Sequence, residues 1–294
     1  MRLFKLFGIV IKINYLLIPI WVFSIYYEYF HELILVMLVI VTHELAHSFV
    51  AIYYGVNVTE IELFPFGGVA RAENYLDLDP FKEMVISIVG PIVNFVLLLI
   101  AIMIQSYITT QVDILLFFIF INLTIGLFNM LPILPLDGGR ILRAYLSNKI
   151  GFKKATKFMI KLSKIIASSL FIISIYLGTK NTENFFLTGI AIFLYFKAHN
   201  EAEKIGYTFI YQIVTKKKQL LDKGIMDVKY LTALESIDLR KVLQEFSTSK
   251  YHFVTVINTK GKVLGNISES EILDAIIQYN YKLTLANLLE ILKK

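Results

Sequence analysis

The chain contains no cysteine among its 294 residues, and only 18% of those residues are charged. Without cysteine there is no disulfide, no thiolate zinc site and no cysteine nucleophile, so a metal site must use histidine and carboxylate side chains. A basic stripe with interleaved aromatic residues is also missing, which argues against direct binding of nucleic acid. Histidine itself is scarce, and the chain offers His31, His43, His47, His199 and His252.

Hydrophobic residues are abundant. They make up 56% of the chain, and the mean hydropathy is +0.66, which is too apolar for an ordinary soluble domain of this length. A transmembrane helix needs about 20 mostly apolar residues. Six runs meet or approach that length, at residues 13–30, 33–54, 82–105, 113–131, 159–178 and 184–197. We therefore predict an α-helical polytopic membrane protein with about six transmembrane helices.

Lysine and arginine are concentrated at one set of span ends. The N-terminal tail contains Arg2, Lys5 and Lys12, and eight lysines and arginines lie between residues 140 and 164. The connection 105–113 contains none. Because lysine and arginine are enriched in cytoplasmic loops, six spans with this distribution predict that both termini are cytoplasmic.

The chain becomes richer in charge from about residue 197, which indicates a membrane part followed by a soluble part. We predict a transmembrane domain at residues 1–200, an amphipathic linker at 201–224 and a small α/β domain at 225–294. In the last domain the pattern predicts a helix, two strands and a second helix, at residues 238–248, 253–257, 263–267 and 269–278.

Residues 55–75 do not have a helical pattern. They combine residues that favour strands with the breakers Pro65, Gly67 and Gly68, which predicts a short β-hairpin or re-entrant loop beside the second span. A plain cytoplasmic loop is the alternative. If a hairpin forms, its exposed strand edge could pair with an extended substrate.

The second apolar run contains the motif His43-Glu44-Leu45-Ala46-His47. Residues four positions apart share a face of a helix, so both imidazoles can reach one Zn²⁺ at about 2.0–2.1 Å. Glu44 lies close to such an ion but off the ligand axis, which suits a general base that acts on water. An ionisable group at bilayer depth costs roughly 2.5–3.5 kcal/mol, so three in one span favour a functional site. The structural alternative is that the two histidines bond to neighbouring helices.

Two ligands leave a catalytic zinc site incomplete, because such sites use three protein ligands and one open position. The membrane region has no further histidine, so the third ligand is expected to be a carboxylate. Asp137 is the best candidate, because Pro132, Pro135 and the two glycines after Asp137 break the helix, and broken backbone at this depth lines a buried or wet cavity. Asp137 as a cap of the following helix is an alternative interpretation, and Asp113 is a weaker candidate for the ligand.

The paired motifs resemble the site-2 protease family of intramembrane metalloproteases. The matching stretches are His43–His47, Gly90–Asn94 and Asn129–Gly138, and the resemblance covers about residues 30–145. It implies metal-assisted hydrolysis of a peptide bond at or inside the bilayer.

The resemblance also implies roles for individual residues. His43, His47 and Asp137 would bind zinc, and Glu44 would activate water. For Asn94 an interhelical hydrogen bond is an equal alternative to a substrate contact. The candidates for substrate or oxyanion binding are Asn129, Pro135, Asn94 and Phe66.

The C-terminal domain resembles a CBS domain, a nucleotide-sensing module, over Phe253–Ile257 and Gly261–Glu271. Such modules usually work in pairs, so a single copy implies a homo-oligomer that forms through the CBS domains of separate chains. Glu271 stands where relatives often carry a ribose-binding aspartate, which implies ATP as a candidate ligand.

The combination of six spans, these motifs and one CBS unit is similar to the sporulation proteases of endospore-forming bacilli within the family. That resemblance implies the membrane-associated precursor of the mother-cell sigma factor, sigma-K, as substrate. It also implies inhibitory membrane proteins as partners, and a location in the mother-cell membrane that surrounds the forespore. Two alternatives are a zinc-dependent membrane peptidase of the prenyl-protease type, whose third ligand is a later glutamate, and a non-enzymatic nucleotide-sensing metal transporter.

Overall fold

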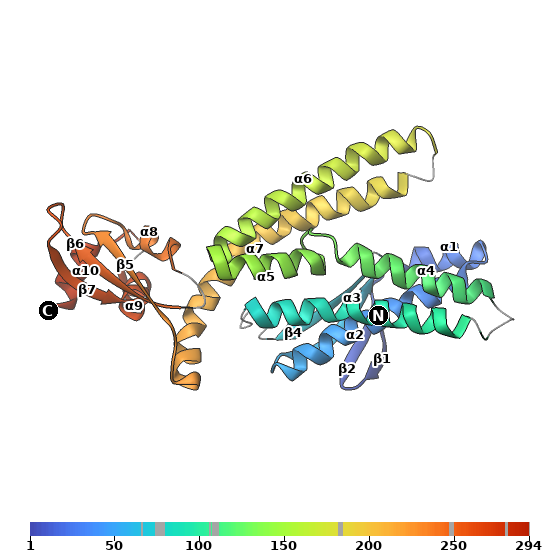
Figure 1. The fold of residues 1–294 in the computed structure, drawn as a ribbon, viewed down its shortest axis with the longest axis horizontal. Coiled ribbons are helices and arrows are strands. Elements are labelled where there is room, and N and C mark those ends of the chain that lie inside the picture. The colour runs from blue at the N-terminus through green and yellow to red at the C-terminus, as the bar shows by residue number, and fades with distance from the viewer. Residues whose placement is uncertain are drawn as a thin grey trace. The chain divides into compact units, whose positions relative to one another are not determined.

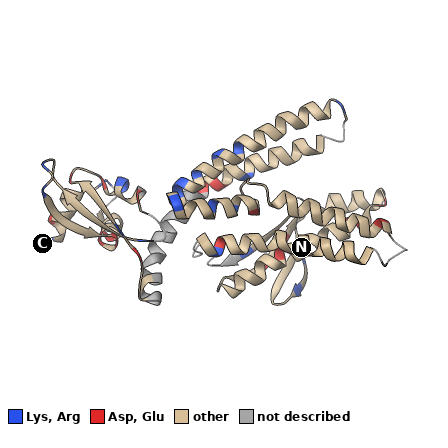
Figure 2. Cartoon of the chain, in the orientation of Figure 1, with Lys and Arg blue, Asp and Glu red and all other residues tan. Residues whose placement is uncertain are grey.

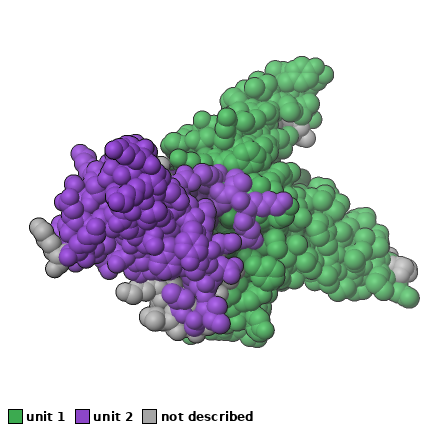
Figure 3. Space-filling model, turned by 60° about the vertical axis from the view of Figure 1, so that its left-hand side comes forward, with its two compact units in different colours: residues 1–147, 155–203 green, residues 148–154, 204–294 purple. Residues whose placement is uncertain are grey.

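The computed structural model of the chain divides into two compact units (Figures 1 and 3). Unit 1 comprises Met1–Ser147 and Ala155–Glu203, and unit 2 comprises Asn148–Lys154 and Lys204–Lys294. The structure describes residues 1–65, 67–73, 80–105, 107, 112–181, 185–246, 250–279 and 282–293.

Four helices in the described part of the chain are long and apolar enough to cross a membrane. At about 1.5 Å per residue, even the 18-residue member is roughly 27 Å long, close to the ~30 Å hydrocarbon core of a bilayer. Figure 2 shows few charged residues along these helices, except in the first half of α6, where lysines gather. They correspond to four of the six predicted spans: α2 (Phe30–Tyr53), α3 (Pro80–Gln105), α4 (Val112–Asn129) and α6 (Phe152–Gly178).

The first and last predicted spans have a different structure. The apolar run at 13–30 is not one helix, contrary to the prediction, because its start belongs to a strand and α1 covers only Leu17–Tyr26. Ten residues extend about 15 Å, half the hydrocarbon thickness. The run at 184–197 lies in α7 (Phe185–Lys223), a continuous helix of 39 residues. Between α4 and α6, the shorter helix α5 covers Asp137–Ile150.

Unit 1 also contains a four-stranded sheet in the order β1-β2-β3-β4. Its strands are β1 (Arg2–Leu6), β2 (Ile9–Ile13), β3 (Asn57–Phe64) and β4 (Gly67–Glu73). β1–β2 and β3–β4 are antiparallel pairs, whereas β2 and β3 are parallel, because the chain passes through α1 and α2 between them. The hairpin predicted at 55–75 is confirmed as β3–β4. Strands β1 and β2 were not among the predicted elements.

One face of this sheet packs against α2. Buried and less buried residues alternate along β2 and β3, the period of strands with a single core-facing side. Ile11 of β2 and Ile61 of β3 are completely buried and share a hydrophobic cluster with Leu45 of α2. The sheet therefore holds the helix that carries the histidine motif.

The C-terminal part of unit 2 is a three-stranded sheet with short helices. β5 is parallel and β7 is antiparallel to the central strand β6, and Val254, Val256 and Ile267 form a completely buried core with the helices. The predicted helix–strand–strand–helix order is confirmed, although the first helix is shorter than predicted and β5 and α10 are additional. The elements are β5 (Val228–Leu234), α8 (Leu239–Gln244), β6 (Tyr251–Ile257), β7 (Val263–Ser268), α9 (Glu269–Tyr279) and α10 (Leu285–Leu292).

Candidate metal centre

Helix α2 carries both histidines of the motif on one face. The ring centroids of His43 and His47 are 4.7 Å apart and the rings are nearly perpendicular, at 84°. Their Nε2 atoms are 3.1 Å apart. The spacing of four residues produces this arrangement, because it places the two side chains in successive turns of the helix.

Asp137, the first residue of α5, completes a group of three. Its Oδ2 lies 3.2 Å from Nε2 of His43 and 3.1 Å from Nε2 of His47. The loop before α5 folds tightly against the start of this helix, since a Cβ on Gly138 would lie only 2.2 Å from the carbonyl oxygen of Met130. The glycine after Asp137 therefore allows the close backbone approach that brings the carboxylate to the histidines.

Helix α3 orients each imidazole through its other nitrogen. Nδ1 of His47 lies 2.7 Å from the carbonyl oxygen of Ile86, and Nδ1 of His43 lies 2.7 Å from Oδ1 of Asn94. A carbonyl oxygen only accepts, so Nδ1 of His47 donates, and its Nε2 presents a lone pair toward Asp137. The amide oxygen of Asn94 gives His43 the same tautomer.

Gly90 provides the space for both rings. A Cβ at this position would lie 2.2 Å from Nε2 and 2.5 Å from Cε1 of His47, and 2.7 Å from Cε1 of His43. Gly90 follows Ile86 by four residues and precedes Asn94 by four, so the three residues lie along one face of α3. That face supplies a hydrogen-bond acceptor for each ring, and Gly90 leaves the space that the two rings occupy.

The three converging atoms fit a zinc ion. Two nitrogen lone pairs and a carboxylate oxygen repel one another at 3.1–3.2 Å unless a cation lies among them. Ligands at about 2.0–2.1 Å from a tetrahedral Zn²⁺ are roughly 3.3 Å apart, close to the observed separations, and two histidines with one aspartate leave the fourth position open. The side chain of Asp137 offers a carboxylate oxygen as the third ligand for such an ion.

Glu44 lies beside this group, half-buried under the sheet. The backbone of β4 passes directly over its side chain, because a Cβ on Gly68 would lie 2.4 Å from Cγ and 3.1 Å from Oε1 of Glu44. β4 is one of the two edge strands of the sheet. A carboxylate suited to proton transfer and the edge of a sheet are thus direct neighbours.

Other predicted site residues have different contacts. Nδ2 of Asn129 donates to the carbonyl oxygen of Ile125 at 3.0 Å, within α4. The carbonyl oxygen of Pro135 accepts from Nε of Arg140 at 3.1 Å. Phe66 lies outside the described residues. The structure thus brings neither Asn129 nor Pro135 into the His–His–Asp group, and for Asn94 it places the amide in the interhelical hydrogen bond.

The more distant candidates have structural contacts as well. Asp113 is exposed in the first turn of α4, and among the described residues the group that could hold a metal ion contains Asp137 instead. Oε2 of Glu271 accepts from the backbone N–H and the hydroxyl of Ser268, both at 2.7 Å, which is a capping box at the start of α9. In the same domain, Nδ1 of the buried His252 lies 2.7 Å from Oε2 of Glu269.

Asn122 of α4 belongs to the site but was not among the predicted residues. It is completely buried. Its Oδ1 accepts from Nδ2 of Asn94 at 3.5 Å, and its own Nδ2 donates to the carbonyl oxygen of Phe118 at 2.8 Å. Asn122 thus supports the amide that orients His43. An amide side chain in the middle of an apolar span is the sequence signal that could have identified it.

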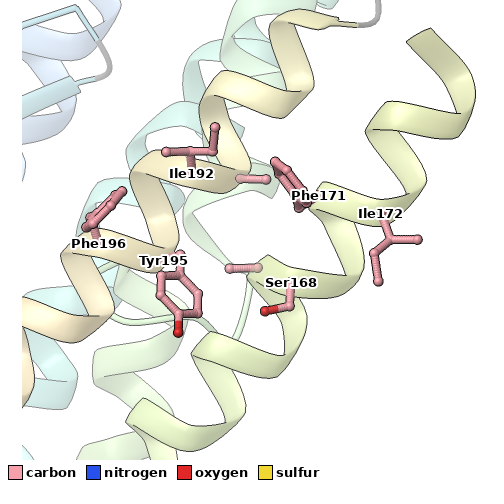
Figure 4. Close-up of a pocket in the computed structure, with 8 residues that line it drawn as sticks. Ser168, Phe171, Ile172, Ile192, Tyr195 and Phe196 are labelled. Carbon is pink, nitrogen blue, oxygen red and sulfur yellow. The ribbon is translucent and has the colours of Figure 1, made fainter. Parts of the chain in front are cut away.

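A separate cavity of about 290 Å³ lies between α6 and α7. Its lining is mostly apolar and includes Phe171, Ile172, Ile192 and Phe196, with Ser168 and Tyr195 contributing the hydroxyl groups (Figure 4). It contains none of the metal-ligating residues. The mostly apolar walls of this cavity suit hydrocarbon.

Two family models match different parts of the chain. The model described as peptidase family M50 matches residues 31–112 and 105–173, which include all three members of the His–His–Asp group. A CBS domain model matches residues 223–278. The membrane part and the C-terminal domain therefore match separate families.

Similar proteins extend over most of the chain. It is 30% identical over 276 residues to the zinc metalloprotease MJ0392 of Methanocaldococcus jannaschii, a match that covers 90% of this chain and 77% of the relative. It is 26% identical over 243 residues to stage IV sporulation protein FB of Bacillus subtilis strain 168, and this match covers 83% of each chain. Among solved structures, the site-2 protease from Methanocaldococcus jannaschii matches with a TM-score of 0.55 and 34% identity, over 68% of this chain and 94% of that one.

Proposed function

The chain belongs to peptidase family M50, the site-2 protease family of zinc metalloproteases, and from this membership we propose that it cleaves a membrane-associated protein at or inside the bilayer. His43, His47 and Asp137 bind the zinc ion, and Glu44 is the general base. The observation that carries this proposal is the convergence of three ligand atoms to within 3.1–3.2 Å of one another. The prenyl-protease alternative needs a later glutamate as third ligand, whereas the carboxylate of this group is Asp137.

The residues around the ion have separate roles in peptide-bond hydrolysis. A bound Zn²⁺ supplies a Lewis acid that polarises the scissile carbonyl and lowers the pKa of water toward about 7. Ile86 and Asn94 keep the two imidazoles in the tautomer whose Nε2 lone pairs face the ion. Glu44 takes the proton of the attacking water and delivers it to the leaving amine.

The substrate binds as an extended segment along β4. A transmembrane helix hides its carbonyl groups in its own hydrogen bonds, so it must unwind locally before cleavage. The outer edge of β4 offers backbone donors and acceptors for such a segment. Gly68 of this strand lies against Glu44, and a segment paired there runs past the base. This contact supports β4 as the substrate-binding strand.

For the substrate we propose the sigma-K precursor, which the protein would process in a regulated way during sporulation. The support for this substrate is the 26% identity to stage IV sporulation protein FB over 83% of both chains. With this substrate we propose inhibitory membrane proteins as partners, both termini in the cytoplasm and a location in the mother-cell membrane around the forespore. Homo-oligomers form through the C-terminal CBS domain, whose matched range is residues 223–278, and ATP is its proposed ligand.

Glu44→Gln tests the proposed reaction, because it keeps the size of the side chain and removes the base. The variant is co-expressed with membrane-tethered precursor proteins, a sigma-K-type precursor among them, and cleavage is scored as a size shift on a gel. We expect cleavage to fall at least about 10²-fold, while the zinc content of the purified protein stays at the wild-type level.

His31→Gln is the matched control, because His31 is an exposed residue at the opposite end of α2. It should cleave and bind zinc as the wild type does. Continued cleavage by Glu44→Gln contradicts the assignment of the base. Cleavage of other tethered precursors without the sigma-K type contradicts the finer substrate assignment and leaves the protease assignment standing.

A further inference from the structure

One face of α3 organises the imidazoles of the metal centre. Ile86 accepts from His47, Gly90 makes room for both rings, and Asn94 binds His43. Glu83 precedes Ile86 by three residues, so it lies on the same face one turn earlier. All four of these α3 residues are buried. The face therefore begins with a buried carboxylate that belongs neither to the ligands nor to their direct partners.

Arg143 of α5 forms an ion pair with this carboxylate through its Nη2. The side chains are only 11% and 9% exposed for Arg143 and Glu83. Arg143 follows Asp137 by six residues in the same helix, a rise of about 9 Å. The pair thus joins the helix that orients the imidazoles to the helix that carries the third ligand. Nη1 of Arg143 lies 3.8 Å from Glu201 of α7, which adds a second, longer contact.

We propose that Arg143 is a positioning residue for the metal centre, which acts through Glu83. A helix of 14 residues transmits a rotation or shift along its length, so a fixed point at Arg143 determines where Asp137 meets the histidines. A buried arginine–carboxylate pair is suited to this task, since removing one partner leaves the other charge buried without its closest counter-charge. The inference rests on the proposed zinc site, because the quantity that Arg143 controls is the distance between Asp137 and the imidazoles.

The test measures zinc affinity of the full-length protein, purified in detergent, by competition with a chromophoric chelator. Arg143→Ala and Glu83→Gln should each weaken zinc binding by about 10–100-fold, the range for residues that orient metal ligands. Arg143→Lys keeps the charge but loses the planar fork, so it should fold and give an intermediate loss. The exchange Glu83→Arg with Arg143→Glu restores an ion pair, and it is combined with Glu201→Gln, which removes the second carboxylate that contacts position 143. This variant should recover most of the lost affinity.

Lys149→Ala is the matched control, because it removes an exposed positive charge from the last turn of the same helix. It should bind zinc as the wild type does. The absorption spectrum of the Co²⁺-substituted protein provides a second readout, since it reports ligand geometry: Arg143→Lys should shift it and Lys149→Ala should not.

Two failures are distinguishable. A wild-type protein that binds no zinc overturns the proposed function and this inference with it. A wild-type protein that binds zinc, with Arg143→Lys and Glu83→Gln binding it equally tightly and with an unchanged Co²⁺ spectrum, overturns the inference alone. Failure of the exchanged pair to recover affinity, where both single variants lose it, shows two separate structural effects and also overturns the positioning role.

Discussion

Gly90→Ala is the smallest change that should disable the metal centre without touching a ligand. The added Cβ would lie 2.2 Å from Nε2 of His47, whereas ordinary contact begins at 3.4 Å, so atoms must move apart by about 1.2 Å. His47 cannot turn away freely, because its Nδ1 is bound to the carbonyl oxygen of Ile86 at 2.7 Å. Functional groups must stay within about 0.5 Å of their productive positions, and the required displacement is more than twice that distance.

The expected loss follows from this displacement. A misplacement of about 1 Å can cost 10²-fold in rate, which corresponds to about 2.7 kcal/mol. We expect kcat/KM for a membrane-tethered substrate to fall about 100-fold, and zinc affinity to fall at least about tenfold. Both are measured on the purified full-length protein, by gel-resolved cleavage and by chelator competition.

Gly189→Ala is the control for this substitution. Gly189 is also helical, in α7, and a Cβ there would meet nothing within 4 Å. The control should therefore keep wild-type zinc affinity and cleavage. If Gly90→Ala binds zinc as tightly as Gly189→Ala does, the close approach of α3 to the imidazoles does not shape the site and the reasoning is refuted.

Two further substitutions separate the roles of base and ligand. Gly68→Ala places a Cβ 2.4 Å from Cγ of Glu44, so cleavage should fall about 10²-fold while zinc affinity stays at the wild-type level; a parallel loss of zinc would contradict the assignment of Glu44 as a non-ligand. Asp137→Ala removes one of three ligand atoms, so chelator competition should show a loss of zinc affinity beyond the roughly 100-fold that outer partners produce; retention of zinc would move the third ligand elsewhere.

Local patterns were sufficient to predict much of the membrane part. The runs that became α2, α3, α4 and α6 are long and mostly apolar, and β3–β4 is marked by breakers around Pro65. Strand β2 was missed because Ile9–Ile13 is short and lacks the apolar–polar alternation of a half-buried strand, and its last residue was counted in the predicted span at 13–30. Its pairing with β3 joins residues about 50 positions apart, and no local pattern contains that information.

The end of the last long helix, α7, is not visible as a change in composition. Lysine and glutamate are good helix formers, so α7 continues through the charge-rich stretch to Lys223. A change in composition therefore does not mark the end of this helix. In the C-terminal domain, β5 was missed because the apolar and polar residues of Val228–Leu234 do not alternate strictly, which leaves its strand pattern weak.

The His–His–Asp group was predictable for chemical reasons. A spacing of four places His43 and His47 on one face, and the scarcity of other ligands leaves a carboxylate in a broken helix as the third. Their partners were less accessible to sequence reasoning. Ile86 contributes only its backbone carbonyl oxygen, and every residue type has that group, so the sequence cannot identify it. Gly90 matters because it has no side chain, which leaves room for the two imidazole rings.

The orientation of His43 depends on the identity of its partner residue, whereas the orientation of His47 does not. The acceptor for His47 is a backbone oxygen, so a substitution at Ile86 changes packing but cannot delete it. The acceptor for His43 is the side chain of Asn94, which in turn contacts Asn122. Loss of either amide therefore weakens the orientation of His43 and leaves that of His47 intact. Substitutions should therefore disturb His43 more readily than His47, because the orientation of His43 depends on the amide side chains of Asn94 in α3 and Asn122 in α4.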